Sequence, residues 1–231
     1  MKKISIGIPT SSPYFHRKFM ESFMKLKYPR DTEVIFHILE QYQIPFARNR
    51  IVQLALENKS DYIFFIDADM IFPPDSLIRL LNRNVDIVHA LSFRRTTPHY
   101  PCIFNWNEKE KCYETIDYSK EDNDLISIDA AGSACTLIKT DVFKKLKVPW
   151  YYYKNHTFSS DLTFSSNAKD AGFNIWVDRT LKIGHLGEEI IVTEESYFKE
   201  LSIDSKKQWN SQMKQHLATE KNNYWKNGKT K

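Results

Sequence analysis

Short apolar runs alternate along this chain with stretches in which apolar residues recur every three to four positions. The first pattern predicts strands, and the second predicts helices. Strands are expected at Lys3–Pro9, Glu33–Leu39, Asp61–Asp67, Val85–Phe93 and Phe173–Asp178. Helices are expected at about Tyr14–Leu26, Pro45–Asn58, Pro74–Leu81, Thr140–Leu146 and Ser159–Ala171. This alternation is typical of an α/β protein with a central sheet.

Two parts of the chain depart from this alternation. Residues 100–117 predict a hairpin or small subsheet, and residues 194–225 predict a polar, helical extension. From Glu200 onward there are seven lysines against three acids, whereas the rest of the chain carries 26 basic and 26 acidic residues. The balanced body excludes a global basic field for nucleic acid.

We therefore expect one domain over residues 1–193 and a basic C-terminal extension over residues 194–231. Such an extension suits a peripheral membrane contact, an anionic acceptor, a homo-oligomer contact or packing on its own domain. At 231 residues and 42% hydrophobic composition, the chain is long enough to bury a real core. No apolar run approaches the roughly 20 residues that cross a bilayer, and no signal-peptide layout is present. These features predict a soluble, cytoplasmic protein.

The strand expected at Asp61–Asp67 is apolar without alternation, which indicates burial on both faces. Open α/β folds bind ligands at the carboxyl edge of the sheet, where Asp67 and Asp69 follow this strand. If the backbone stays extended, both side chains point to the same side. A divalent cation would offset their repulsion and take up the charge of a departing nucleoside diphosphate. The alternative is that Asp67 caps a turn while Asp69 is solvated.

Other short segments surround Asp67-Ala68-Asp69 in a fixed order along the chain. They are Pro9-Thr10 at the end of the first strand, Ala47-Arg48-Asn49 in the second helix, AGSACTLIKTDVF from 131, SSDLTFSSNAKDAGFNIWVD from 159, and IGHLGE from 183. Over roughly residues 3–190 this order resembles the GT-A glycosyltransferases, in particular the family 2-like enzymes. The resemblance implies a Rossmann-like mixed central sheet flanked by helices. It also implies transfer of a sugar from a nucleoside-diphosphate sugar, with a UDP-sugar favoured, to an acceptor hydroxyl.

The resemblance also implies roles for individual side chains. Asp69 would bind Mn²⁺ or Mg²⁺ directly and Asp67 would assist, with His185 completing the metal site as a neutral imidazole. Asp161 would be the general base of an inverting transfer. Relatives carry Glu-Asp where this chain has Ser160-Asp161, and a retaining outcome stays open. A structural alternative for His185 is a satisfied loop histidine, and for Asp161 a residue that stabilises a helix N-terminus.

We expect residues from both sides of the sheet edge to contribute to the donor site. Its candidate contacts to the nucleotide, the diphosphate and the donor sugar are Pro9, Thr10, Glu40, Arg48, Asp67, Ala68, Gly132 and Ser133. Arg50, Arg94 and Arg95 are further candidates for phosphate or acceptor contacts, and the alternative for each is a solvated position on the surface. The aromatic run Trp150–Tyr153 suits stacking on an acceptor sugar, although core packing explains any one of its members equally well.

Other classes of protein share parts of this pattern. A phosphatase of the haloacid dehalogenase type also uses Asp-x-Asp, but on its N-terminal strand and with the first Asp as nucleophile. A sugar nucleotidyltransferase shares much of the fold, but its glycine- and arginine-rich N-terminal loop is absent here. A catalytically inactive sugar-binding module is the non-enzymatic alternative. The sequence leaves the acceptor open among a glycan, a lipid-linked sugar, a protein and modified DNA.

Overall fold

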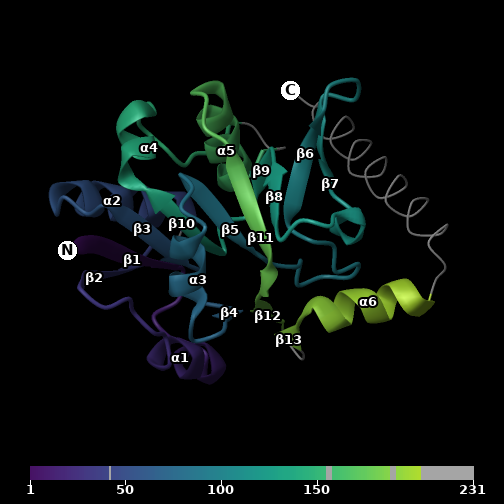
Figure 1. Ribbon diagram of the computed structural model, residues 1–231, viewed down its shortest axis with the longest axis horizontal. Coiled ribbons are helices and arrows are strands. Elements are labelled where there is room, and N and C mark those ends of the chain that lie inside the picture. Colours follow the sequence, from purple (N-terminus) through teal and green to yellow (C-terminus); the bar gives the residue numbers. More distant parts are fainter. Residues whose placement is uncertain (42, 155–157, 188–190, 204–231) are drawn as a thin grey trace, which may run out of the picture.

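The computed structural model describes residues 1–41, 43–154, 158–187 and 191–203. They fold around a seven-stranded mixed sheet (Figure 1). In spatial order its strands are β2 (Thr32–Glu40), β1 (Lys2–Thr10), β3 (Tyr62–Ile66), β10 (Cys135–Lys139), β5 (Ile87–Leu91), β11 (Ile175–Lys182) and β8 (Leu125–Ile128). Strands β10 and β8 run antiparallel to the other five.

Helices cover both faces of this sheet (Figure 1). One face packs against α2 (Ile44–Glu57), α4 (Thr140–Lys145) and α5 (Ser160–Asp170). The other face packs against α1 (Arg17–Met24) and α3 (Ser76–Asn82). Residues 63–66 of β3 are fully buried, because successive side chains alternate between two covered faces. The predicted α/β class, with a mixed central sheet flanked by helices, is confirmed.

Two three-stranded sheets lie outside the central one. One contains β13 (Ile191–Val192), β12 (Gly184–Leu186) and β4 (Met70–Ile71), in that order. The other contains β7 (Cys112–Thr115), β6 (Ile103–Asn107) and β9 (Ala130–Ala131). The predicted hairpin over residues 100–117 is confirmed by β6 and β7, which pair antiparallel. The sheet that joins residues 70–71 to residues 184–186 was not expected, because such two-residue pairings leave no period in the sequence.

The five predicted helices and the five predicted strands all occur, with small shifts at their ends, whereas β8 and β10 of the central sheet were not predicted. Helix α1 starts at Arg17 instead of about Tyr14, because the Nδ1 atom of His16 accepts a hydrogen bond from the Lys18 amide and caps the helix. Helix α5 is capped by Ser159, whose hydroxyl oxygen accepts from the Leu162 amide. A short 3₁₀ turn, η1 (Tyr118–Lys120), connects β7 to β8.

The C-terminal part of the described chain begins a helix at the expected boundary. Helix α6 spans Glu194–Ile203, and Tyr197 in it is buried against Phe93 and Tyr118. The rest of the predicted extension, residues 204–231, lies outside the described residues, so the division at residue 193 stays a prediction. Across the described residues, none of the helices combines the length and the apolar character needed to cross a membrane.

Helix α2 lies very close to the sheet at Gly7 of β1. A Cβ atom at this position would lie 2.6 Å from Cγ2 of Ile51 and 3.1 Å from Cδ1 of Phe65. A methyl group would therefore overlap a helix that is fixed by the rest of the core. The absence of a side chain at Gly7 sets how closely α2 approaches β1 and β3.

We expect Gly7→Ala to lower the free energy of unfolding by about 1–3 kcal/mol, as overpacked core substitutions do. Chemical denaturation with a fluorescence readout measures the change. Ile51→Ala removes the methyl group that the new Cβ would strike. The double variant Gly7→Ala/Ile51→Ala should therefore be more stable than the sum of the two single effects predicts. Strict additivity of the two changes would contradict this account.

Candidate active site

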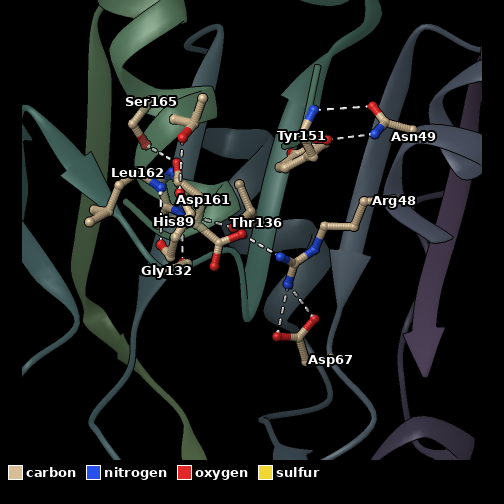
Figure 2. A network of polar contacts seen from close by, with 12 residues as sticks. Arg48, Asn49, Asp67, His89, Gly132, Thr136, Tyr151, Asp161, Leu162 and Ser165 are labelled. Carbon is tan, nitrogen blue, oxygen red and sulfur yellow. Dashed lines mark hydrogen bonds and ion pairs between the residues drawn. The ribbon is translucent and has the colours of Figure 1, made fainter. Parts of the chain in front are cut away.

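Arg48 joins two carboxylates that lie far apart in the sequence (Figure 2). Its side chain comes from α2 and is only 3% exposed. Its Nη2 atom donates to both carboxylate oxygens of Asp67, at 2.8 and 3.0 Å. Its Nη1 atom donates to Oδ1 of Asp161, at the start of α5. Figure 2 shows the guanidinium lying between the two acidic side chains.

These three charges stabilise one another in a buried place. Burial alone would lower the pKa of Arg48, but the charges of Asp161 and Asp67 raise it above its usual value. Burial raises the pKa of Asp67 to about 6, and the repulsion from Asp161 and Asp69 acts in the same direction, while Arg48 opposes the rise. The guanidinium is therefore the counter-charge of the buried Asp67 carboxylate, whose pKa would rise further without it.

The backbone between Asp67 and Asp69 does not stay extended. Strand β3 ends at Ile66, and the Met70 amide donates to the Asp67 carbonyl oxygen at 3.2 Å, which closes a turn. Extended geometry was the condition for two side chains directed to one side, and the turn removes that condition. Asp67 consequently contacts Arg48, whereas Asp69 contacts residues from other segments.

Asp69 lies beside His185, as the resemblance implied for a shared site. The pairing of β4 with β12 places His185 opposite Met70, the residue that follows Asp69. Its Nε2 atom is 3.2 Å from Oδ2 of Asp69, and Arg95 approaches the same oxygen at 3.3 Å. Burial alone would raise the pKa of Asp69, but the hydrogen bond from His185 and the charges of His185 and Arg95 lower it below its usual value.

The chemistry of the His185 ring fits a cation at this place. Its Nδ1 atom is 2.9 Å from the Phe93 carbonyl oxygen, which only accepts hydrogen bonds, so Nδ1 carries a proton. Nε2 faces Oδ2 of Asp69 at 3.2 Å, and without a proton it would present a lone pair to that oxygen. Two acceptors face each other only if a proton or a metal ion lies between them.

Asp67, Asp69 and His185 do not converge on one point. Within residues 1–41, 43–154, 158–187 and 191–203, the structure gathers no group of three or more His, Cys, Asp or Glu side chains that would hold a metal ion. Asp69 and His185 form a pair, while both oxygens of Asp67 contact Arg48. The predicted three-residue metal site therefore stays a prediction, supported in its Asp69–His185 part.

The expected nucleotide-binding residues lie at the same edge of the sheet. Pro9 and Thr10 end β1, and Thr10 pairs with Glu40 at the end of β2. The Thr10 hydroxyl donates to the Ser12 carbonyl oxygen at 2.8 Å and so holds the following turn. Glu40 is exposed, and Ala68 lies in the turn that follows β3.

The expected donor-sugar wall lies on the other side of the Arg48 cluster from the expected nucleotide-binding residues. Gly132 and Ser133 come between β9 and β10, and the Gly132 carbonyl oxygen is 3.2 Å from Nδ1 of His89. Ser133 is buried. Arg50, by contrast, is exposed and pairs with Glu57 on the surface of α2, which is the solvated alternative.

The aromatic run divides between the core and the surface. Trp150 and Tyr151 are buried, and Tyr151 stacks on Phe164 with a centroid distance of 4.8 Å. These two residues are core residues rather than stacking surfaces for an acceptor. Tyr153 is 58% exposed, so part of the run faces solvent, as expected for four consecutive aromatic residues.

Asn49 and His89 belong to this region but were not singled out by residue type. The Asn49 side chain accepts from the Trp150 and Tyr151 amides at 2.9 and 3.1 Å and donates to the Tyr151 carbonyl oxygen at 2.6 Å. It therefore attaches the aromatic segment to α2, next to Arg48. Its place in Ala47-Arg48-Asn49 was the available signal. His89 lay inside an apolar strand pattern and gave none.

His89 is a buried, neutral histidine on β5. Its Nδ1 atom is 2.8 Å from the Thr136 hydroxyl in addition to its contact with Gly132 (Figure 2). Burial lowers its pKa to about 4, against a smaller opposing effect of the hydrogen bond with Gly132. Its Nε2 atom is buried and has no hydrogen-bond partner in the described part of the chain. The ring is therefore held without a charge beneath the Arg48 cluster.

At the carboxyl edge of the central sheet, the fold joins Arg48, Asp67 and Asp161 in one cluster and places Asp69 beside His185. Among solved structures, the chain is similar to A197 from STIV, with 17% identity, a TM-score of 0.60, and coverage of 85% of this chain and 92% of that one. It is also similar to S. aureus TarS 1–349 in complex with UDP-GlcNAc, with 12% identity and a TM-score of 0.48, over 83% of this chain and 57% of that fragment. No family model and no curated protein matches the sequence.

We expect Arg48→Ala to lower the free energy of unfolding by about 2–4 kcal/mol, because it leaves two partly buried carboxylates without their counter-charge. Equilibrium denaturation at pH 7 measures the loss. Arg50→Ala is the matched control on the same helix, and its exposed ion pair should contribute less than about 1 kcal/mol. Equal effects of the two substitutions would contradict the role of Arg48.

His89 should make stability depend on pH. The unfolded imidazole binds a proton near the ordinary histidine pKa of 6.5, whereas burial lowers the pKa of the folded one to about 4. Between these values the unfolded state holds more protons, so stability falls as pH is lowered. From pH 7 to pH 5 the loss from this group is about 2 kcal/mol. Urea denaturation of wild type and His89→Asn should show a shallower pH dependence in the variant, and parallel curves would exclude this contribution.

Proposed function

We propose that this protein is a metal-dependent glycosyltransferase that moves a sugar from a nucleoside-diphosphate sugar, with a UDP-sugar favoured, to an acceptor hydroxyl. The observation that carries the proposal is the Arg48 cluster. It joins Asp67, at the end of β3, to Asp161, the candidate base in the first turn of α5. The two acids belong to the two sides of the reaction, donor and acceptor, that a transferase has to bring together.

The donor side is supported by the pair Asp69 and His185. A carboxylate and an imidazole that donates its other N–H to a backbone carbonyl are ligands suited to Mn²⁺, and the same pair accommodates Mg²⁺ less well. When bound, such an ion stabilises the negative charge of a leaving nucleoside diphosphate. Asp67 supports the site from the side of Arg48. Pro9, Thr10 and Glu40 end the two neighbouring strands, where a base and ribose would lie.

The acceptor side is supported by Asp161. Its carboxylate accepts a proton from the acceptor hydroxyl while that oxygen attacks the anomeric carbon of the donor. The bond from the anomeric carbon to the diphosphate oxygen breaks in the same displacement, and the nucleoside diphosphate leaves with the bonding electrons. Arg48 keeps Asp161 in one orientation through its Nη1 atom. A single displacement inverts the anomeric centre, which is the outcome we propose over retention.

The contacts of Asp67 argue against the phosphatase alternative. A nucleophilic aspartate has to present a free oxygen to the phosphorus atom. Both oxygens of Asp67 accept hydrogen bonds from Arg48, and the motif follows the third strand of the chain rather than the first. An inactive sugar-binding module would keep the fold but would not need the buried Arg48–Asp161 pair.

Two substitutions should separate donor binding from transfer. We expect Asp69→Asn to weaken Mn²⁺-dependent binding of the donor, because it removes the charged ligand beside His185. We expect Asp161→Asn to preserve donor binding and to slow transfer by about 10²–10⁴-fold, the range for loss of a general base. Calorimetry with nucleotide sugars and Mn²⁺ measures the first effect, and release of the nucleoside diphosphate measures the second.

Asp141→Asn is the matched control for these variants, since Asp141 is an exposed aspartate in the first turn of α4, beside the amino end of β3 and not at the carboxyl end that carries Asp67. It should leave both readouts unchanged. Donor binding that survives Asp69→Asn in full would remove the metal assignment. A wild-type protein that binds nucleotide sugars but never cleaves them would support the inactive module instead.

A further inference from the structure

Trp106 is an exposed aromatic side chain on β6, beside the helix that carries Asp161. It is 36% exposed, and its ring centroid is 5.1 Å from that of Tyr113 in a T-shaped arrangement. Phe158 lies 6.3 Å from Trp106 and 5.7 Å from Tyr113, measured between centroids. The three rings therefore form a small aromatic cluster whose indole is partly open to solvent. Partly open indoles are enriched at binding surfaces, because the ring offers a large apolar face together with a polar N–H.

Hydrogen bonds hold the indole in one orientation. Its Nε1 atom donates to Glu108 at 2.7 Å, and the Trp106 amide donates to Oδ2 of Asp129 at 2.9 Å. The other oxygen of Asp129 pairs with Lys169 of α5 at 2.8 Å, which attaches the β6–β7 hairpin to this helix. A ring that is already fixed loses little conformational entropy when a ligand stacks on it.

The cluster is connected to the candidate active site from two sides. Phe158 precedes Asp161 by three residues. Strand β6 pairs with β9 at Ile103 and Ala131, and the next residue, Gly132, belongs to the expected donor-sugar wall. Trp106 lies three positions along the strand from Ile103, which is about 10 Å. In Figure 1 the β6–β7 hairpin lies beside β9 and α5 at the same end of the molecule.

The surroundings of Trp106 favour a sugar over an apolar ligand. The Glu108 carboxylate accepts a hydrogen bond from the indole N–H, and the Tyr113 hydroxyl is hydrogen-bonded to Ser166 of α5. Trp106 and Tyr113 share one face of the hairpin, because they are paired across β6 and β7. A carboxylate and a hydroxyl beside one aromatic face match a sugar ring, which has hydroxyl groups at its edge and C–H bonds on its face. A docking site for an apolar protein surface would show a larger continuous apolar patch. Lys111 and Lys169 pair with the carboxylates of Glu108 and Asp129, so these pairs leave no net positive charge for the phosphates of a nucleic acid.

We propose that Trp106, supported by Tyr113 and Phe158, is a stacking subsite for a sugar ring of the acceptor, which makes the acceptor a carbohydrate. The inference rests on the proposed transferase function and names its acceptor class. Donor binding depends on other residues, at the ends of β1, β2 and β3. The subsite therefore acts on the Michaelis constant for the acceptor and leaves donor cleavage by water unchanged.

A glycan array probed with wild type, Trp106→Ala and Trp106→Phe tests this subsite directly. Wild type should bind one class of oligosaccharide, Trp106→Ala should bind it at least about tenfold more weakly, and Trp106→Phe should fall between them because it keeps a ring. Phe36→Ala is the matched control. Phe36 lies on the distant edge strand β2, is 46% exposed, and contacts two other aromatic rings, as Trp106 does. It should bind as wild type does. Thermal unfolding of each variant reports on folding separately.

Hydrolysis of nucleotide sugars by the same proteins separates the two proposals. Retained hydrolysis in Trp106→Ala, with a raised Michaelis constant for the oligosaccharide acceptor, supports the subsite. Absent hydrolysis in wild type contradicts the transferase function, while the array still tests sugar binding at Trp106. Equal glycan binding by wild type and Trp106→Ala overturns the subsite. A wild-type protein that binds no glycan also overturns it, and directs the aromatic cluster toward a protein partner.

Discussion

The site depends on one buried cation. Arg48 carries a positive charge into the space between α2 and the end of β3, where Asp67 and Asp161 would otherwise repel each other. Two carboxylates brought out of water need a counter-charge with good geometry, and a guanidinium supplies two separate donor directions. The position of Arg48 is itself secured by the close approach of α2 to the sheet at Gly7 and by the contacts of Asn49 with the aromatic segment. The packing of α2 against the core therefore also determines where the positive charge of the site lies.

A second centre lies one turn of chain away and has a different character. The turn after β3 separates Asp69 from Asp67 and leaves Asp69 to His185 and Arg95. This arrangement divides the acids of a single short motif. Asp67 is held by the buried Arg48, which also holds the candidate base Asp161. Asp69 faces the imidazole of His185, whose Nδ1 atom is fixed by a backbone carbonyl. Under the proposed function, this division would let the candidate base Asp161 keep its orientation whether or not a cation and a diphosphate are bound beside Asp69.

The β6–β7 hairpin, which carries the proposed acceptor subsite, is also positioned by contacts with the rest of the domain. It lies outside the central sheet but is attached to α5 through Asp129 and Lys169, so it is positioned by the helix that carries Asp161. A binding surface on a short hairpin is precise only if the hairpin is anchored to a rigid element. The aromatic cluster around Trp106 supplies that rigidity within the hairpin as well.

The sequence by itself determined the α/β class, the five helices that cover the central sheet, five of its seven strands, and the presence of Asp67, Asp69, Asp161 and His185 at element ends, because apolar periodicity and turn residues are local properties. It did not reveal which of these side chains meet. The partners of Arg48 depend on contacts between residues 19 and 113 positions apart. The β4–β12 pairing that delivers His185 to Asp69 is too short to leave a pattern. Only tertiary packing decided these, since long-range geometry has no signature in a local window. For the same reason Trp150 and Tyr151 turned out to be core, while Trp106 was left open.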